Sequence, residues 1–201
     1  MKDNSQPPDN NKQGLKKKNL KKYILISLTA FISLILICTL LYVKWAVFDY
    51  RVYEIDKGKV YRSMRIPYKK IQKVLLDHKI KTVIDLRNMD ELLIEEEKKA
   101  VRNIGLRYEQ IPMDQMPSQN NIDYFLKLLD DPSVYPVLIH CRHGIGRTGI
   151  MSAIYRIEYQ KWDNNKARIE SNLLGGLGAF KKDEPKGALV MNYIPRWKKM
   201  K

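Results

Sequence analysis

The longest hydrophobic pattern in the sequence is a run of uncharged, mostly apolar residues from Tyr23 to Val43, with a lysine on each side. As a helix that rises about 1.5 Å per residue, this run spans roughly 30 Å, the hydrocarbon thickness of a bilayer. Trp45 and Phe48 follow it and are typical of a membrane interface. A cleaved signal peptide is the closest alternative, but the run exceeds a usual signal core and no small-residue cleavage motif follows. The pattern predicts a single-pass transmembrane anchor over residues 23–48.

The segment before this run is polar and carries seven lysines against two aspartates. It has too few apolar side chains to build a core, so we expect residues 1–22 to be disordered. The positive-inside rule keeps such a lysine-rich flank in the cytoplasm. It therefore places residues 49–201 outside the cytoplasm, which is the periplasm if the source is bacterial. The opposite orientation, with a cytoplasmic domain, is the alternative.

In residues 49–201, short β-branched runs alternate with segments of helical periodicity. Residues 81–86 (KTVIDL) are typical of a buried strand, and Ile71, Val74 and Leu75 have helical spacing behind Pro67. The expected strands are 50–56, 60–62, 81–86, 106–111 and 135–140, and the expected helices are 67–78, 90–103, 121–130, 147–161 and 164–174. This order predicts an α/β fold, a mostly parallel central sheet flanked by helices. In such sheets, sites lie where strands end and helices begin.

Composition and charge narrow the class of protein. A chain of 201 residues with 44% hydrophobic and 29% charged residues fits one folded domain with an appendage. Its net charge is +15, of which residues 49–201 contribute +9 through 29 basic and 20 acidic side chains. That excess indicates an anionic partner: nucleic acid, lipid headgroups or a phosphorylated substrate. Two cysteines exclude a disulfide scaffold and an all-cysteine zinc site.

The segment after the expected strand 135–140 carries the most specific motif, His140-Cys141-Arg142-His143-Gly144-Ile145-Gly146-Arg147-Thr148-Gly149. A loop between a strand end and a helix start can turn its N–H groups inward, and the helix N-terminus adds positive potential. A phosphoryl dianion fits that cradle, and an arginine six residues after the cysteine can bind two of its oxygens. The same field lowers a thiol pKa from about 8.5. A buried cysteine beside turn glycines is the alternative, but the whole motif in one strand–loop–helix context is specific.

This motif resembles the signature of cysteine-dependent protein tyrosine phosphatases, and it is most similar to compact dual-specificity-type members. Further similarity lies at Val60–Ser63, Thr82–Arg87, Pro136–Ile139 and Trp162–Glu170, so the resemblance covers about residues 59–175. It implies a tyrosine-phosphatase-like fold and hydrolysis through a phosphocysteine, with no metal and no cofactor.

The resemblance also implies roles for single residues. Cys141 attacks phosphorus, and Arg147 and the amides of residues 142–147 stabilise the transition state. Thr148 helps the sulfur to leave, and His140 orders the loop and lowers the thiol pKa. The substrate-binding positions are Arg142, His143, Gly144, Ile145 and Gly146.

Phosphatase chemistry also needs a general acid. Asp114 is the candidate, because it lies in the loop Ile111–Pro117 at the place where the family carries its acid. A solvated loop aspartate is the alternative. Asp85 ranks second, in a strand-end motif that the family uses structurally. Arg62 and Arg87 are candidates for a basic rim or for structural ion pairs.

The sequence therefore predicts a phosphomonoester hydrolase of the protein-tyrosine and dual-specificity class, acting on a phosphorylated protein or a phosphorylated small molecule. Phosphoinositides or inositol phosphates are alternative substrates, because the domain is basic and tethered at a membrane. A non-catalytic phosphoryl-binding module is a second alternative, which predicts loss of the cysteine, arginine or acid. RNA 5′-triphosphatases share part of the motif, but the anchor and the lack of an aromatic stacking platform argue against nucleic acid.

Overall fold

The computed structural model describes residues 10–175 and 178–199. The chain divides into two compact units, Met1–Phe48 and Asp49–Lys201.

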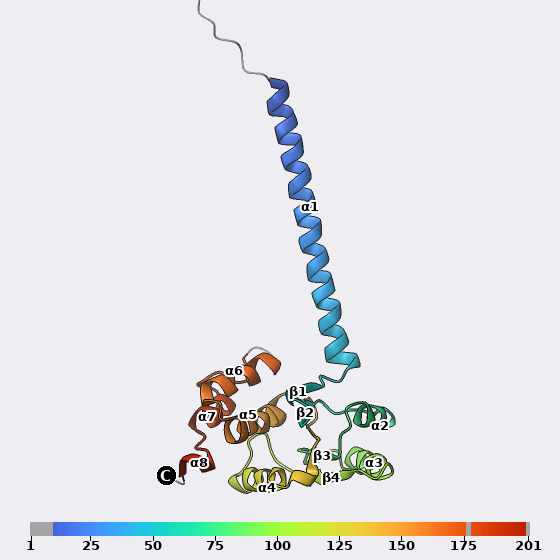
Figure 1. The fold of residues 1–201 in the computed structure, drawn as a ribbon, viewed down its shortest axis with the longest axis vertical. Coiled ribbons are helices and arrows are strands. Elements are labelled where there is room, and N and C mark those ends of the chain that lie inside the picture. Colours follow the sequence, from blue (N-terminus) through green and yellow to red (C-terminus); the bar gives the residue numbers. More distant parts are fainter. Residues whose placement is uncertain (1–9, 176–177, 200–201) are drawn as a thin grey trace, which may run out of the picture. The chain divides into compact units, whose positions relative to one another are not determined.

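The first unit is one long helix, α1 (Asn10–Val43), continued by a short π-helix, η1 (Lys44–Phe48) (Figure 1). By length and composition, its segment Lys21–Ala46 could span a membrane, with a mean hydropathy of 2.7. Our expectation of disorder over residues 1–22 is corrected for residues 10–22, which are helical. Lysine and glutamine are good helix formers, and extending an existing helix costs far less than nucleating one. Residues 1–9 lie outside the described residues.

The second unit is built on a five-stranded sheet with the order β1-β2-β5-β3-β4. The strands are β1 (Tyr53–Asp56), β2 (Val60–Ser63), β3 (Thr82–Asp85), β4 (Arg107–Gln110) and β5 (Val137–His140). Only the β1–β2 hairpin is antiparallel; the β2–β5, β5–β3 and β3–β4 pairs are parallel. The predicted mostly parallel sheet is confirmed. In its register, His140 lies beside both Ser63 and Asp85, so three strands end at the same edge.

Helices cover both faces of this sheet, with α2 and α3 on one side and α4 to α8 on the other (Figure 1). Their bounds are α2 (Tyr68–Asp77), α3 (Glu91–Arg102), α4 (Gln119–Leu129), η2 (Pro132–Val134), α5 (Gly146–Gln160), α6 (Asn164–Leu174), α7 (Pro185–Asn192) and α8 (Arg196–Lys199). The five predicted helices are present within a few residues of their expected bounds. The two last helices were not predicted, since they are too short to show a clear period.

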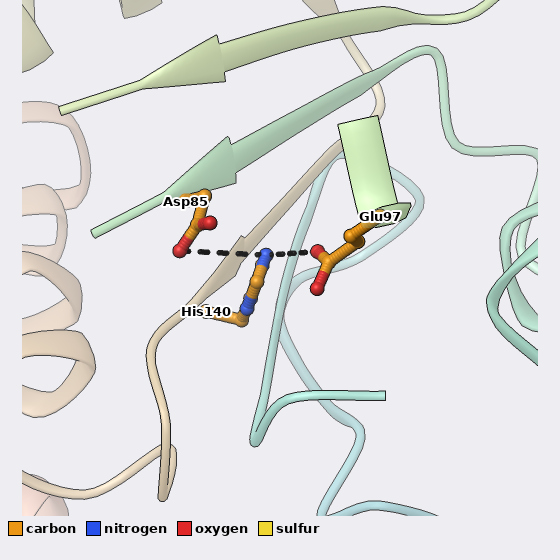
Figure 2. A group of neighbouring side chains, drawn as sticks. All are labelled: Asp85, Glu97 and His140. Carbon is orange, nitrogen blue, oxygen red and sulfur yellow. Dashed lines mark ion pairs between the residues drawn. The ribbon is translucent and has the colours of Figure 1, made fainter. Parts of the chain in front are cut away.

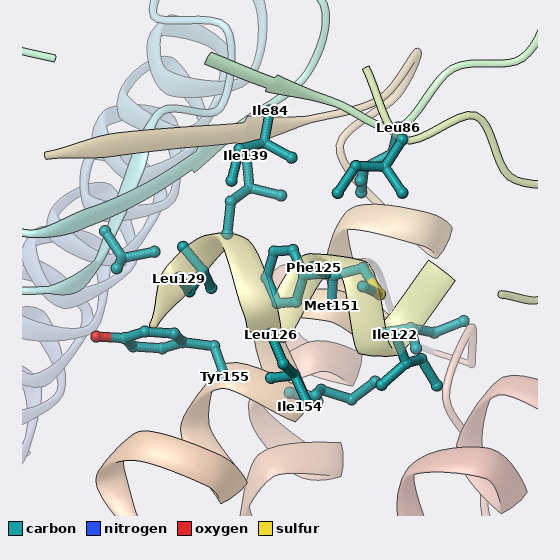
Figure 3. Packing of buried hydrophobic residues seen from close by; sticks show 14 of the residues in the cluster. Ile84, Leu86, Ile122, Phe125, Leu126, Leu129, Ile139, Met151, Ile154 and Tyr155 are labelled. Atoms are coloured by element: carbon teal, nitrogen blue, oxygen red, sulfur yellow. The ribbon is translucent and has the colours of Figure 1, made fainter. Parts of the chain in front are cut away.

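Side chains point alternately to the two faces of the sheet, so they pack into two separate hydrophobic clusters. Val83 and Leu138 pack with residues of α2 and α3, whereas Ile84 and Ile139 pack with residues of α4 and α5. Figure 3 shows the second cluster, where the strand residues face Phe125 and its neighbours. Because side chains alternate, Asp85 and His140 belong to the α3 side, while Cys141 belongs to the α5 side. The strand ends thus place a charged group on one face and the cysteine on the other.

Candidate active site

The loop between β5 and α5 is fixed by contacts with the segment that contains β2. Arg62 donates from Nη2 to the carbonyl oxygen of Gly144 at 2.7 Å, and the amide of Arg65 donates to the carbonyl oxygen of Arg142 at 3.2 Å. Arg62 is buried, so it is a structural residue and not part of a basic rim. Gly144 has φ +67° and approaches the Ser63 backbone closely. The loop is therefore a defined shape and not a free turn.

Cys141 begins this loop and is only 3% exposed. Burial alone would raise its pKa, but hydrogen bonds from the Thr148 hydroxyl and from the amides of Thr148, Gly144 and His143 outweigh burial and hold the pKa of Cys141 below its ordinary value. His140 is not among these main causes. The Thr148 hydroxyl is itself buried, and no hydrogen-bond partner among the described residues competes with the sulfur for it. The loop therefore has the inward-directed donors that the motif predicted.

Arg147 lies at the second position of α5 and joins two other segments. Its Nη1 donates to the carbonyl oxygens of Leu86 and Met113 and to Oδ1 of Asn88, each at 3.1 Å. Leu86 follows β3, and Met113 lies in the loop between β4 and α4. The guanidinium is therefore placed where the loops after three strands meet.

Asp114 is exposed in the β4–α4 loop, and its Oδ1 accepts a hydrogen bond from Nδ2 of Asn88 at 2.7 Å. Asn88 thus links Asp114 to Arg147 through its two amide ends. Asp114, Arg147, Arg142 and His143 line one pocket of about 200 Å³. The structure brings these four predicted residues together; Cys141 is not among the lining residues.

Beside the loop, His140 belongs to a buried charged cluster. Its Nε2 lies 2.7 Å from Oε1 of Glu97 and 3.9 Å from Oδ1 of Asp85, and Figure 2 shows the imidazole between the two carboxylates. Arg87 binds both carboxylates at 2.7 Å, and the Tyr108 hydroxyl donates to Asp85 at 2.5 Å. Burial opposes the charge on His140, but Glu97 and Asp85 outweigh it and raise the pKa of His140 to about 9.

In this cluster, Asp85 and Arg87 have structural roles. Both side chains are buried and paired with each other, so Asp85 is not available as an acid and Arg87 is not part of an exposed rim. Asp85, Glu97 and His140 have ligand atoms within 4.8 Å of one another. Arg87 and the protonated imidazole already balance the two carboxylates, however, so their charge does not require a cation.

Residues 67–184 match the family model described as "DSP-PTPase phosphatase fused to NAD+ kinase". The matched segment is more than half of the 201 residues and contains the whole Cys141 loop. The chain belongs to this phosphatase family. The predicted resemblance to dual-specificity-type phosphatases is thereby confirmed.

Two curated relatives match parts of the chain. The dual specificity protein phosphatase TpbA of Pseudomonas aeruginosa is 51% identical over 43 residues, which are 21% of this chain and 19% of the relative. An mRNA-capping enzyme of Caenorhabditis elegans is 29% identical over 120 residues, 58% of this chain and 18% of that enzyme. The matches thus span about a fifth of the length of these curated relatives.

Solved structures show the same fold over a larger share of the chain. The crystal structure of P. aeruginosa TpbA has a TM-score of 0.59 at 25% identity and covers 73% of this chain and 86% of that one. The core catalytic domain of the PP-IP phosphatase SIW14 from S. cerevisiae, in complex with citrate, has a TM-score of 0.60 at 20% identity, covering 71% and 85%. The latter likeness is one of fold.

Three residues of this phosphatase domain near the loop were missed by the sequence analysis. Asn88 follows β3, so the rule that sites gather at strand ends could have found it. Gln115 follows Asp114, and its Oε1 lies 3.4 Å from the position that a Cβ on Gly146 would occupy. Lys186 comes from α7 and lies even closer to that position, at 3.0 Å from Nζ. No local pattern in the sequence connects Lys186 with the loop.

Gly144→Ala is expected to destabilise the domain by roughly 2–4 kcal/mol, because a side chain is strained at φ +67° and its Cβ would lie 2.6 Å from the Ser63 carbonyl oxygen and the Met64 nitrogen. Gly58→Ala is the matched control, since Gly58 has the same φ but nothing within 4 Å. We expect it to cost about 1 kcal/mol. Chemical unfolding of the full chain in detergent measures both. Equal losses in the two variants would show that the close approach at Gly144 does not matter.

The charged cluster predicts that the domain loses stability as the pH rises from about 6.5 to about 9. The pKa of His140 is raised from its ordinary 6.5 to about 9, so its stabilising contribution is complete below pH 6.5 and is lost as the imidazole deprotonates. The loss is on the order of 3 kcal/mol. Unfolding should be followed in a Cys141→Ser background, which removes thiol titration from the same range. Glu97→Gln should flatten the decline, and an unchanged slope in that variant would contradict the assignment.

Proposed function

We propose that residues 49–201 form a phosphatase of the protein-tyrosine and dual-specificity class, which hydrolyses phosphomonoesters through a phosphocysteine intermediate. The observation that carries this proposal is the donor set around Cys141, which outweighs burial and favours a thiolate. A thiolate is the form that attacks phosphorus, and a buried structural cysteine would not need such donors. Membership of a phosphatase family supports the same activity.

In the first step, the sulfur of Cys141 attacks phosphorus in line and the bond to the leaving oxygen breaks. Arg147 exchanges its carbonyl acceptors for phosphoryl oxygens, which form stronger, charge-assisted hydrogen bonds. The amides of the loop bind the remaining oxygens. Protonated Asp114 gives its proton to the leaving oxygen, which therefore departs as an alcohol or phenol.

In the second step, a water molecule attacks the phosphocysteine and the Asp114 carboxylate takes its proton. The bond between sulfur and phosphorus breaks, and inorganic phosphate is released. The buried Thr148 hydroxyl donates to the departing sulfur and stabilises its negative charge. Asn88 holds Asp114 near the site in both steps through its 2.7 Å hydrogen bond.

Arg142, His143, Gly144, Ile145 and Gly146 form the substrate-binding loop in this proposal. Arg142 and His143 are exposed at the pocket, where they can contact the group that carries the phosphate. TpbA has been solved with phosphotyrosine, and SIW14 is named a PP-IP phosphatase. Phosphotyrosine in a protein is therefore our first substrate class, and inositol phosphates are the second.

A phosphate-release panel on the full chain in detergent tests the proposal. It should contain phosphotyrosine and phosphoserine peptides, an inositol phosphate and 5′-triphosphorylated RNA, each with wild type and Cys141→Ser. We expect release from the phosphotyrosine peptide by wild type alone. Binding of these compounds without release by wild type would favour the non-catalytic phosphoryl-binding module. Equal release by both proteins would refute the phosphocysteine mechanism.

We also propose that residues 23–48 anchor the protein in a membrane, with residues 49–201 outside the cytoplasm. The apolar composition of Lys21–Ala46 and the lysine-rich flank before it support this orientation. Labelling of an introduced cysteine, Lys182→Cys, by a membrane-impermeant maleimide in intact cells measures the side. Labelling only after lysis would place the domain in the cytoplasm.

A further inference from the structure

Lys186 reaches the phosphate loop from outside the Cys141 motif. It is the second residue of α7, and its side chain is half-buried. A Cβ added to Gly146 would lie 3.0 Å from its Nζ and 3.2 Å from its Cε. Gly146 directly precedes Arg147, so the ammonium lies beside the loop that would bind the scissile phosphate.

The backbone around Lys186 is held in place by packing. A Cβ on the next residue, Gly187, would lie 1.8 Å from the carbonyl oxygen of Lys181, so α7 begins in direct contact with the preceding chain. That chain is fixed in turn, because Arg168 donates to the carbonyl oxygen of Phe180 at 2.7 Å and Phe180 is fully buried. The position of Lys186 is thus set by the core and not by a free loop.

The charge of Lys186 has no counterpart within the part of the chain that the structure describes. Residues 10–175 and 178–199 include no hydrogen-bond or ion-pair partner for it. A cation near the N-terminus of a helix is also unfavourable, because the helix dipole is positive there. The placement therefore does not stabilise α7, but it would attract an anion.

Space for such an anion exists next to the pocket of Asp114 and Arg147. Lys186 lines a second cavity of about 450 Å³, together with Gln115, Met116, Gly178, Ala179, Glu184 and Pro185. Gln115 lines both cavities, so they are neighbours on either side of one residue. Glu184 also lines this cavity but is exposed to solvent, whereas Lys186 is half-buried.

We infer that Lys186 and Gln115 form a second anion subsite, which binds another phosphoryl group of the same substrate molecule beside the one that is cleaved. This inference rests on the proposed function, because it takes the loop as the place of the scissile phosphate. The preferred substrates then carry two neighbouring phosphates. A small bisphosphate and a doubly phosphorylated peptide share this chemistry, and the experiment separates them.

The test compares matched pairs of substrates with one and two phosphates. One pair is inositol monophosphate and a vicinal inositol bisphosphate, and the other is a phosphotyrosine peptide with and without an adjacent second phosphotyrosine. The readout is the ratio of kcat/KM within each pair. For the full chain in detergent, Lys186→Met should lower this ratio about tenfold in the preferred pair, since a hydrogen-bonded charge pair is lost. Lys186→Arg should keep the ratio, and Lys182→Met, an exposed lysine of the same segment, is the control.

The outcome that overturns the inference is an equal ratio in wild type and Lys186→Met for both pairs, or an equal fall with Lys182→Met. A binding measurement distinguishes failure of the subsite inference from failure of the proposed function. In a Cys141→Ser background, calorimetry should show that Lys186→Met weakens the bisphosphate about tenfold more than the monophosphate. That result can hold even if wild type releases no phosphate, and equal weakening would refute the subsite.

Discussion

Phosphate release by Cys141→Ser is expected to fall by roughly 10⁴- to 10⁶-fold relative to wild type, the size of loss that follows removal of an enzyme nucleophile. The donors that lower the pKa of Cys141 stabilise a thiolate. A serine hydroxyl is far less acidic than a thiol, so the same donors cannot supply a comparable concentration of alkoxide. The change replaces one buried atom and leaves the loop, Arg147 and Asp114 in place.

The measurement is single-turnover and steady-state phosphate release by the full chain, with circular dichroism to show that the variant is folded. The variant should still bind a phosphotyrosine peptide, because the loop amides and Arg147 remain. Retained binding separates loss of the nucleophile from loss of the site. A variant that keeps more than about a hundredth of the wild-type rate would exclude Cys141 as the attacking group.

The part of the site that the sequence predicted is the part that a single segment builds. The apolar run Val137–Ile139 predicts a buried strand, and Gly144, Gly146 and Arg147 then follow at the turn into α5. Local chemistry favours this loop, and the family resemblance supplies the roles proposed for its residues. The register of β3 and β5 then places Asp85 beside His140 on one face of the sheet.

The parts that the sequence could not predict depend on contacts between distant segments. Glu97 pairs with His140 across 43 positions of sequence, and its surroundings in α3 look like an ordinary solvated helix face. Lys186 lies beside Gly146 because packing around Phe180 and Gly187 brings α7 to the loop. No local pattern in the sequence indicates this contact. The helix over residues 10–22 was missed since composition argues for disorder there, while helix propagation from the apolar run acts against it.

The position of Arg147 connects these observations. Its Nη1 donates to the carbonyl oxygens of Leu86 and Met113 and to Oδ1 of Asn88. Met113 adjoins Asp114, so a phosphate that draws Arg147 into the loop would also release one contact of the segment that carries the proposed acid. In the proposed mechanism, binding of substrate and placement of Asp114 are therefore linked through one guanidinium.

Asp114→Asn is expected to lower kcat/KM, which reports the steps up to departure of the leaving group, by roughly 10²- to 10³-fold for substrates with poor leaving groups, and far less for an activated aryl phosphate. A poor leaving group must receive a proton as its bond to phosphorus breaks, whereas an activated aryl oxide leaves as an anion. Asparagine keeps the size of the side chain and a carbonyl oxygen that can accept from Asn88, but it has no transferable acid proton. The loss should therefore depend on the leaving group and not on binding.

A series of aryl phosphates with increasing phenol pKa, together with a phosphotyrosine peptide, measures this dependence. Asp123→Asn is the matched control, because Asp123 is a nearby carboxylate whose hydrogen bond is with Gln119 on the surface of α4. In wild type, kcat/KM should depend little on phenol pKa; in Asp114→Asn it should fall steeply as the phenol becomes less acidic. An equal loss across the series would mean that Asp114 only positions its loop. The proton would then have to come from another group, and Asp85 is excluded because it is buried and bound to Arg87.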